Sequence, residues 1–202
     1  MLSARLEGGE IICLDDASQD DTWNVLSAAA GNNTAVRVIR HDQNQGIAAA
    51  FSRLFREAKG THIYLTGGDG QWPASNLGIL FNQWAQTGDD LIIGVRRNRY
   101  LVYGPWRTML SYGFNTLGFF ITGFNGRDIN GIKLGRREIF IEPVKSQSFF
   151  AEIERLQKAL RRGYRVSHAP VVFCQRVQGR GQGARLKNIT DTLKDFLKHL
   201  TP

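Results

Sequence analysis

The stretch Glu10-Ile-Ile-Cys-Leu-Asp-Asp16 decides how the rest of the sequence is interpreted. Its four apolar residues end in two acids, which is typical of a buried strand whose carboxyl end faces a ligand. A helical pattern follows at 18–30, and Val36–His41 is again strand-like. This order predicts a β-α-β unit with Asp15 and Asp16 at its ligand-binding edge.

The same alternation continues along the chain. It predicts further strands at 61–66 and 91–95, with helices at 47–58 and 74–86. After residue 98 the pattern loosens, and we expect helices at 105–121, 149–162 and 186–200 and strands at 129–134 and 164–173. The expected fold class is α/β, a Rossmann-like, mostly parallel sheet flanked by helices on both faces, in a single domain.

Composition narrows the class of protein. The 202 residues are 42% hydrophobic and 22% charged, as in an ordinary globular domain. A net charge of +8 favours anionic partners such as nucleotide phosphates, nucleic acid or an acidic membrane surface. Two cysteines make no disulfide framework, and neither a signal-peptide pattern nor an apolar run of ~20 residues occurs. We therefore expect a cytoplasmic protein.

A second ligand-binding edge is predicted after the third strand, at Gly67-Gly68-Asp69-Gly70-Gln71. Carboxylates at such strand ends can bind a base, a ribose or a hard divalent cation. Glycines let a diphosphate approach the backbone. The alternative for Asp15 and Asp16 is that they cap the next helix, although two adjacent acids exceed what a cap needs.

The ordered set of these motifs resembles the nucleotide-binding half of family 2 glycosyltransferases, which have the GT-A fold. The segments that carry the resemblance are Glu10–Thr22, Val36–Gly46, Ala58–Gly60, Gly68–Gln71 and Asp90–Arg96.

The second half resembles dolichol-phosphate mannose synthases and related polyprenyl-phosphate glycosyltransferases. Arg107, Ser111 and Asn115 lie four residues apart, on one face of the predicted helix. The similarity continues through Asp128–Arg137, Phe150–Glu152, Arg162–Arg165, Pro170-Val171 and Arg176.

The resemblance implies a glycosyltransferase that moves a sugar from a UDP- or GDP-linked donor to dolichyl or undecaprenyl phosphate with inversion. Residues 1–98 would bind the nucleotide sugar and residues 99–202 the acceptor. The implied nucleotide contacts are Asp15 and Asp16, and Asp69 and Gln71 would hold Mg²⁺ or Mn²⁺ on the diphosphate. The acceptor phosphate would bind Arg96, Arg107 and Ser111, and the implied catalytic residues are Asp69, Arg96 and Arg107.

Two departures from the family pattern matter. Gly67 stands where the family has an aspartate, so a weakened cation site is expected. Family members also have a strand and turn before the segment that begins here at Glu10, and nine residues precede it. We therefore expect an N-terminally truncated GT-A fold with a gap or rearrangement between neighbouring strands. A catalytically impaired nucleotide-sugar-binding or scaffold protein of the same fold is the alternative.

The closing helix is amphipathic, with leucines at helical spacing and lysines largely elsewhere around it. Such a helix can lie on an acidic membrane surface, which predicts a peripheral position on the cytoplasmic face; packing on the core is the alternative. Nucleic acid is not an expected partner, because the sequence lacks a recognition-helix or aromatic-platform signature.

Four side chains keep two interpretations each. Arg107 binds phosphate or extends along a surface helix, and Asp128 belongs to the site or to a turn. Glu152 is a helix-face charge or a catalytic group. Arg176, with Gly179–Gly183, forms a phosphate-binding loop or a solvated one.

Overall fold

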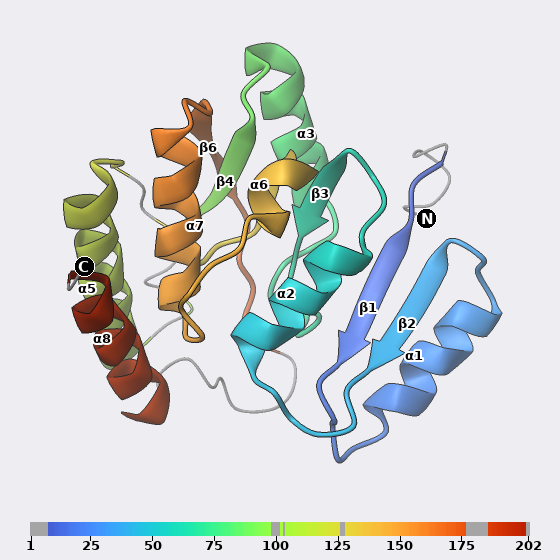
Figure 1. The fold of residues 1–202 in the computed structure, drawn as a ribbon. Coiled ribbons are helices and arrows are strands. Elements are labelled where there is room, and N and C mark those ends of the chain that lie inside the picture. The colour runs from blue at the N-terminus through green and yellow to red at the C-terminus, as the bar shows by residue number, and fades with distance from the viewer. Residues whose placement is uncertain (1–7, 98–101, 103, 126–127, 177–185, 201–202) are drawn as a thin grey trace. The chain divides into compact units, whose positions relative to one another are not determined.

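A computed structural model describes residues 8–97, 102, 104–125, 128–176 and 186–200 of the chain. The chain forms two compact units, Met1–Thr61 and His62–Pro202, which are coloured along the sequence in Figure 1. The boundary between these two compact units lies after Thr61. It does not coincide with residue 98, the predicted boundary between the nucleotide-binding and acceptor-binding halves.

The first unit is one β-α-β-α segment. It contains strands β1 (Ile11–Asp15) and β2 (Val36–Arg40) and helices α1 (Thr22–Gly31) and α2 (Ile47–Glu57). The two strands pair in parallel, with Asp15 opposite Arg40 at their carboxyl ends. Helix α1 packs on β2 and α2 packs on β1. The strand–helix alternation predicted for this segment is confirmed.

The second unit is built on a four-stranded sheet in the order β3-β5-β4-β6. These strands are β3 (His62–Leu65), β4 (Leu91–Arg96), β5 (Lys133–Arg136) and β6 (Val166–Val171). Strand β5 is antiparallel to β3 and β4, whereas β4 and β6 are parallel. Three strands therefore run in one direction, and their carboxyl ends share one edge. The predicted α/β class with a parallel-rich sheet is confirmed.

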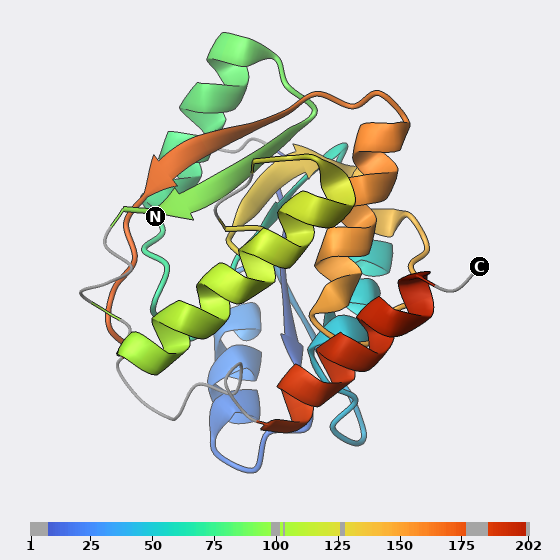
Figure 2. The ribbon, with the colours of Figure 1, turned by 90° about the vertical axis from the view of Figure 1, so that its left-hand side faces the viewer.

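Helices cover both faces of this sheet. Helix α3 (Asn76–Thr87) lies on one face, and α5 (Pro105–Thr122) and α7 (Phe150–Arg161) lie on the other, as Figure 2 shows. The short α6 (Arg137–Ile141) follows β5, and α8 (Leu186–Leu200) packs on α7. Beneath α3, a continuous apolar core contains Leu80, Ile92, Ile132, Leu134, Ala169 and Val171.

Strand β5 begins later than the sequence predicts, because residues 128–132 form a tight turn against β4. The turn is closed by the Gly131 N–H, which donates to the Asp128 carbonyl over 2.7 Å, and the Gly94 N–H donates to the Ile132 carbonyl over 2.8 Å. A Cβ on Gly131 would lie 2.6 Å from the Gly94 carbonyl oxygen. The backbones can approach this closely only with glycine at position 131.

Among the described residues, no strand ladder joins the β1-β2 sheet to the four-stranded sheet. The missing first strand is predicted for residues 1–9, of which residues 1–7 lie outside the described residues. The expected truncation of the fold therefore stays a prediction.

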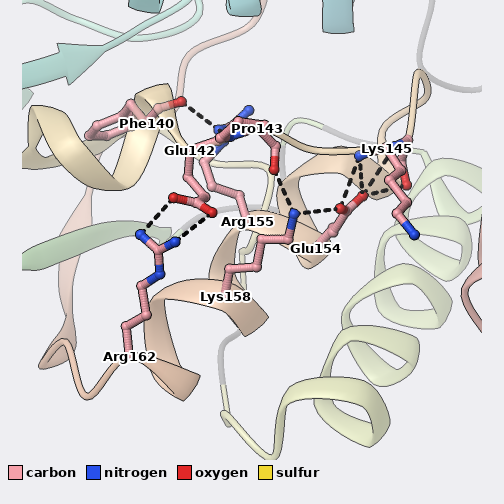
Figure 3. Close-up of polar contacts among 9 residues, drawn as sticks. Phe140, Glu142, Pro143, Lys145, Glu154, Arg155, Lys158 and Arg162 are labelled. Atoms are coloured by element: carbon pink, nitrogen blue, oxygen red, sulfur yellow. Dashed lines mark hydrogen bonds and ion pairs between the residues drawn. The ribbon is translucent and has the colours of Figure 1, made fainter.

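Helix α7 anchors the loop that precedes it through a buried polar network (Figure 3). The Glu154 side chain accepts hydrogen bonds from the N–H groups of Lys145 and Ser146, at 3.0 and 3.1 Å. Burial raises the pKa of the Glu154 carboxyl, but these N–H donors lower it more, so its pKa lies below the usual range. Arg155 donates to the carbonyls of Phe140 and Glu142. The loop is thus held by groups that α7 buries.

Glu152, two residues before Glu154 on α7, forms a buried ion pair. Its Oε2 lies 2.7 Å from Lys133 Nζ, and its Oε1 lies 3.5 Å from Arg155 Nε. Burial raises the pKa of Glu152, whereas the charges of Lys133 and Arg155 lower it more, and the net pKa is below the ordinary value. Glu152 is therefore a structural ion-pair partner rather than an exposed helix-face charge.

Replacement of Glu152 by glutamine should lower the free energy of unfolding by about 3–5 kcal/mol, because Lys133 stays buried without its counter-charge. The double variant Glu152→Met, Lys133→Met should lose clearly less than the sum of the two single variants. Urea unfolding followed by tryptophan fluorescence measures the free energy of unfolding of the single and double variants. Because the folded pKa of Glu152 is lowered, its contribution is present above the unfolded pKa and disappears as pH falls through the folded pKa. Equal stability of Glu152→Gln and the wild type would contradict this structural role.

Candidate functional site

In the first unit, Asp15 is buried and fixes the turn that follows β1. Its Oδ1 accepts the Ser18 N–H over 2.9 Å, and its Oδ2 lies 3.2 Å from Arg40 Nε. Helix α1 begins only at Thr22, so Asp15 is not its cap. Oδ1 of Asp15 is therefore hydrogen-bonded within the unit, whereas Oδ2 is buried beside the Arg40 charge and has no hydrogen-bond donor among the described residues.

Asp16 organises the loop between β2 and α2. Its Oδ1 accepts the Gln45 N–H over 2.9 Å and lies 2.7 Å from His41 Nδ1, and its Oδ2 accepts the Gly46 N–H over 2.8 Å. Burial raises the pKa of Asp16, but these N–H groups and His41 lower it more, to below the ordinary 3.8. His41 is not among the site residues predicted from the sequence, although its position directly after a strand is a usable signal.

The Asp16→Asn variant should loosen the loop at 41–46, because a neutral amide accepts backbone N–H groups more weakly than a carboxylate does. Amide hydrogen exchange at Gln45 and Gly46 should accelerate by about tenfold. In the wild type the loop should stay protected above pH 3.8 and open as pH falls through the lowered pKa of Asp16. The control is Asp42→Asn, an exposed acid in the same loop. Identical exchange in the two variants would show that Asp16 does not hold the loop.

In the second unit, three strand ends bring the other predicted site residues to one edge. The loop after β3 carries Asp69 and Gln71, and the extension of β6 carries Arg176. Arg176 Nη2 lies 2.6 Å from Asp69 Oδ2 and 3.2 Å from Gln71 Oε1. Asp69 Oδ1 accepts the Gln71 N–H over 3.0 Å. The expected cation ligands thus contact a guanidinium.

Arg96, at the end of β4, is built into the wall of this edge. Asp128 accepts the Arg96 backbone N–H over 2.8 Å and its Nε–H over 3.0 Å, and it also contacts Nη2. The guanidinium carbon lies 5.1 Å from the Phe173 ring centre and 5.8 Å from that of Trp72. The Arg96 side chain is only 8% exposed. Asp128 is therefore the buried counter-charge of Arg96 as well as a turn residue.

Helix α5 presents the remaining predicted residues. Ser111 Oγ lies 3.5 Å from Arg96 Nη2, and Arg107 is one turn earlier and half-buried. Asn115 donates to the Ser111 carbonyl and accepts the Ile129 N–H over 3.0 Å. Asn115 thus ties α5 to the turn that contains Asp128.

The structure therefore gathers Asp69, Gln71, Arg96 and Ser111 within the second unit, whereas Asp15 and Asp16 belong to the first. Sequence reasoning missed the aromatic residues Trp72 and Phe173, whose rings lie 4.6 Å apart beside Arg96. Trp72 directly follows the glycine-rich loop, which was the available signal. Residues 179–183 lie outside the described residues.

The sequence profile of Glycosyl transferase family 2 matches residues 4–142, more than half of the chain. The chain belongs to this family. The undecaprenyl-phosphate mannosyltransferase of Micrococcus luteus is 24% identical over 84% of this chain and 74% of its own length. The dolichol-phosphate mannosyltransferase of Pyrococcus furiosus is 28% identical over 95% of this chain, which spans 54% of that relative.

Solved structures of similar fold are GT-A glycosyltransferases. A Pyrobaculum calidifontis mannosyltransferase with GDP-Man and Mn²⁺ matches with a TM-score of 0.62 and 20% identity, over 94% of this chain and 55% of its own. Glucosyl-3-phosphoglycerate synthase from Mycobacterium tuberculosis, with Mn²⁺, UDP-Glc and phosphoglyceric acid, gives 0.64 at 17% identity, over 91% of this chain and 67% of its own. The predicted family and GT-A fold are confirmed.

The residues of this family 2 chain do not make a divalent-cation site in the arrangement described. Within the described residues, no group of three His, Cys, Asp or Glu side chains could hold a metal ion. Arg176 contacts both Asp69 and Gln71, and Gly67 contributes no ligand. The loop Gly67–Gln71 carries one carboxylate where the family pattern has two.

Proposed function

We propose that this glycosyltransferase transfers a sugar from a nucleotide-diphosphate sugar to a polyprenyl phosphate, with inversion at the anomeric carbon. Support comes from the relatives named as undecaprenyl-phosphate and dolichol-phosphate mannosyltransferases. The observation that carries the proposal is the wall formed by Arg96 and Ser111, with Arg107 one turn away. Basic and hydroxyl groups together at a strand edge are donors suited to a phosphate.

The acceptor chemistry fits this wall. A polyprenyl phosphate oxygen is already anionic, so it attacks the anomeric carbon without a strong general base. The bond from the anomeric carbon to the donor's diphosphate oxygen breaks, and the nucleoside diphosphate leaves with the electron pair. Arg107 and Ser111 would orient the attacking phosphate, and Arg96, held by Asp128, would add fixed positive charge.

The donor is proposed to bind through residues 1–98 and the acceptor through residues 99–202. Asp15 and Asp16 are proposed to contact the nucleotide, and the loop at Asp69 and Gln71 to face the diphosphate. The carboxylates of Asp15 and Asp16 already accept hydrogen bonds within the first unit. They would therefore contribute to nucleotide binding through the loops that they order and through the remaining lone pairs of their oxygens.

A membrane surface is the proposed location of the acceptor, on the cytoplasmic face. Helix α8 is fastened to the second unit by Asp195, which accepts the N–H groups of Gln147 and Ser148 over 3.0 Å, and by contact between Phe196 and Phe150. Four leucines of this helix are exposed: Leu186, Leu193, Leu197 and Leu200. Helix α5 likewise exposes Trp106, Met109, Tyr112, Phe119 and Phe120. None of the described helices is long and apolar enough to cross a bilayer.

The test of the reaction is transfer from UDP- and GDP-linked hexoses to a polyprenyl phosphate, measured as radiolabelled lipid product. Arg107→Ala should lower kcat/KM for the acceptor by about tenfold to hundredfold, because a charged donor to phosphate is lost. The control is Arg161→Ala, an exposed arginine at the end of α7. An Arg107 variant as active as the control would place the acceptor elsewhere. A chain that binds donor but transfers nothing would favour the impaired binding or scaffold protein.

Removal of the exposed leucines of α8 tests the membrane surface. Leu193→Ser, Leu197→Ser and Leu200→Ser together should weaken binding to vesicles of acidic phospholipid by at least about tenfold, because the inserted apolar area is lost. Co-sedimentation measures the bound fraction. The control is Val25→Ser on α1, which removes another exposed apolar side chain. Undiminished binding by the triple variant would remove α8 from the proposed surface.

A further inference from the structure

Arg176 is brought to Asp69 by two segments that run side by side. The Cys174 N–H donates to the Gln71 carbonyl over 2.9 Å, and Gln71 Nε2 donates to the Cys174 carbonyl over 3.3 Å. Arg176 lies two residues after Cys174, and Asp69 lies two residues before Gln71. The side chains of Arg176 and Asp69 contact each other beside this pairing. Asp69 Oδ1 also accepts the Gln71 N–H over 3.0 Å across the bend at Gly70, whose φ is +73°, so the bend and the backbone pairing together set the contact.

The support beneath the pairing is buried. Asn76 is fully buried, donates through Nδ2 to the Val172 carbonyl over 2.8 Å, and accepts the Val172 N–H over 3.0 Å. Packing of Trp72 on Phe173 adds an apolar contact between the same segments. The guanidinium is therefore delivered by a fixed frame rather than by a surface side chain that happens to lie nearby.

The charges of the Asp69–Gln71 loop and of Arg176 balance without a metal ion. Asp69 supplies the negative charge and Arg176 the positive one, and Gly67 supplies none. One nitrogen of the guanidinium, Nη2, makes both contacts, which use two of the five N–H groups that an arginine carries, and the side chain is 27% exposed. A donor remains for an incoming oxygen, and arginine suits phosphate oxygens particularly well.

We propose that Arg176 is the resident cation of the Asp69–Gln71 loop, and that nucleoside diphosphates bind there through its guanidinium without a divalent cation. This inference rests on the proposed function, in which the donor is a nucleotide-diphosphate sugar. It adds that Arg176 supplies the positive charge that faces the diphosphate. A divalent ion would have to displace the guanidinium from Asp69 and would gain only one carboxylate ligand. Such an ion prefers about six oxygen ligands, so its binding at this loop is unfavourable.

Binding of UDP and GDP, measured by isothermal titration calorimetry in EDTA and again in Mn²⁺, tests the proposal. The wild type should bind one of them in EDTA, and Mn²⁺ should change its Kd by less than about threefold. Arg176→Gln should weaken binding in EDTA by at least about tenfold, because a charge-assisted donor is lost. The control Arg161→Gln removes an exposed arginine on α7 and should bind like the wild type.

The opposite change can be made at Gly67. A Cβ there would lie 3.6 Å from Asp69 Oδ1 and 3.5 Å from Trp72 Cδ1, which is ordinary contact, so a side chain fits. Gly67→Asp should place a second carboxylate beside Asp69, create binding of Mn²⁺ alone, and make diphosphate binding depend on Mn²⁺. Gly67→Asn has the same size without the charge and should do neither.

The outcomes separate the two proposals. Wild-type binding of nucleotide only with Mn²⁺, unaffected by Arg176→Gln, would overturn the role of Arg176 and leave the sugar-transfer proposal standing. No binding of either nucleotide under any condition would overturn both. Metal-free binding that is lost in Arg176→Gln, together with acquired Mn²⁺ dependence in Gly67→Asp, would establish the guanidinium as the cation.

Discussion

The buried ion pair between Arg96 and Asp128 is the interaction on which the second unit's edge depends. Asp128 accepts both the backbone and the side chain of Arg96, so the end of β4 and the turn before β5 are fixed to each other. Asn115 attaches α5 to that same turn, and Trp72 and Phe173 lie over the guanidinium. Loss of either charge would leave the other buried without a partner, which is strongly unfavourable. One ion pair therefore positions a helix, a turn and two strand extensions together.

Three acids of the candidate site accept backbone N–H groups in this way. Asp16 collects the N–H groups of Gln45 and Gly46, Asp69 accepts that of Gln71, and Asp128 accepts that of Arg96. Each carboxylate first orders the backbone around it, because buried or half-buried N–H groups need an acceptor. A ligand at these edges meets loops that are already organised, and it must add to the existing hydrogen bonds or exchange with them. Ordering the loop and contacting the ligand are thus compatible roles for one side chain.

Local patterns were sufficient to predict most of the elements and the family. Apolar runs such as Leu91–Val95 and the helical spacing at 105–121 are properties of short segments, and the structure has β4 and α5 there. The antiparallel insertion of β5 was not predictable, because strand order depends on contacts distant in sequence. Five-residue α6 is too short to show a helical period. The partners of Asp69 and Asp128 were equally hidden: Arg176 is 107 residues from Asp69, and Arg96 is 32 from Asp128.

The effect of glycine instead of aspartate at position 67 can be judged only from the contacts of the folded protein. In the sequence, a missing carboxylate implies a weaker cation site and, by extension, a weaker enzyme. In the structure, the remaining carboxylate is paired with the Arg176 guanidinium, whose segment is held in place by hydrogen bonds from Gln71 and Asn76. A departing diphosphate requires stabilisation of negative charge, and fixed donors in a partly desolvated edge can provide it as well as an ion can. The remaining acid and the arginine form a pair in the folded protein, so the missing acid at position 67 does not by itself imply loss of activity.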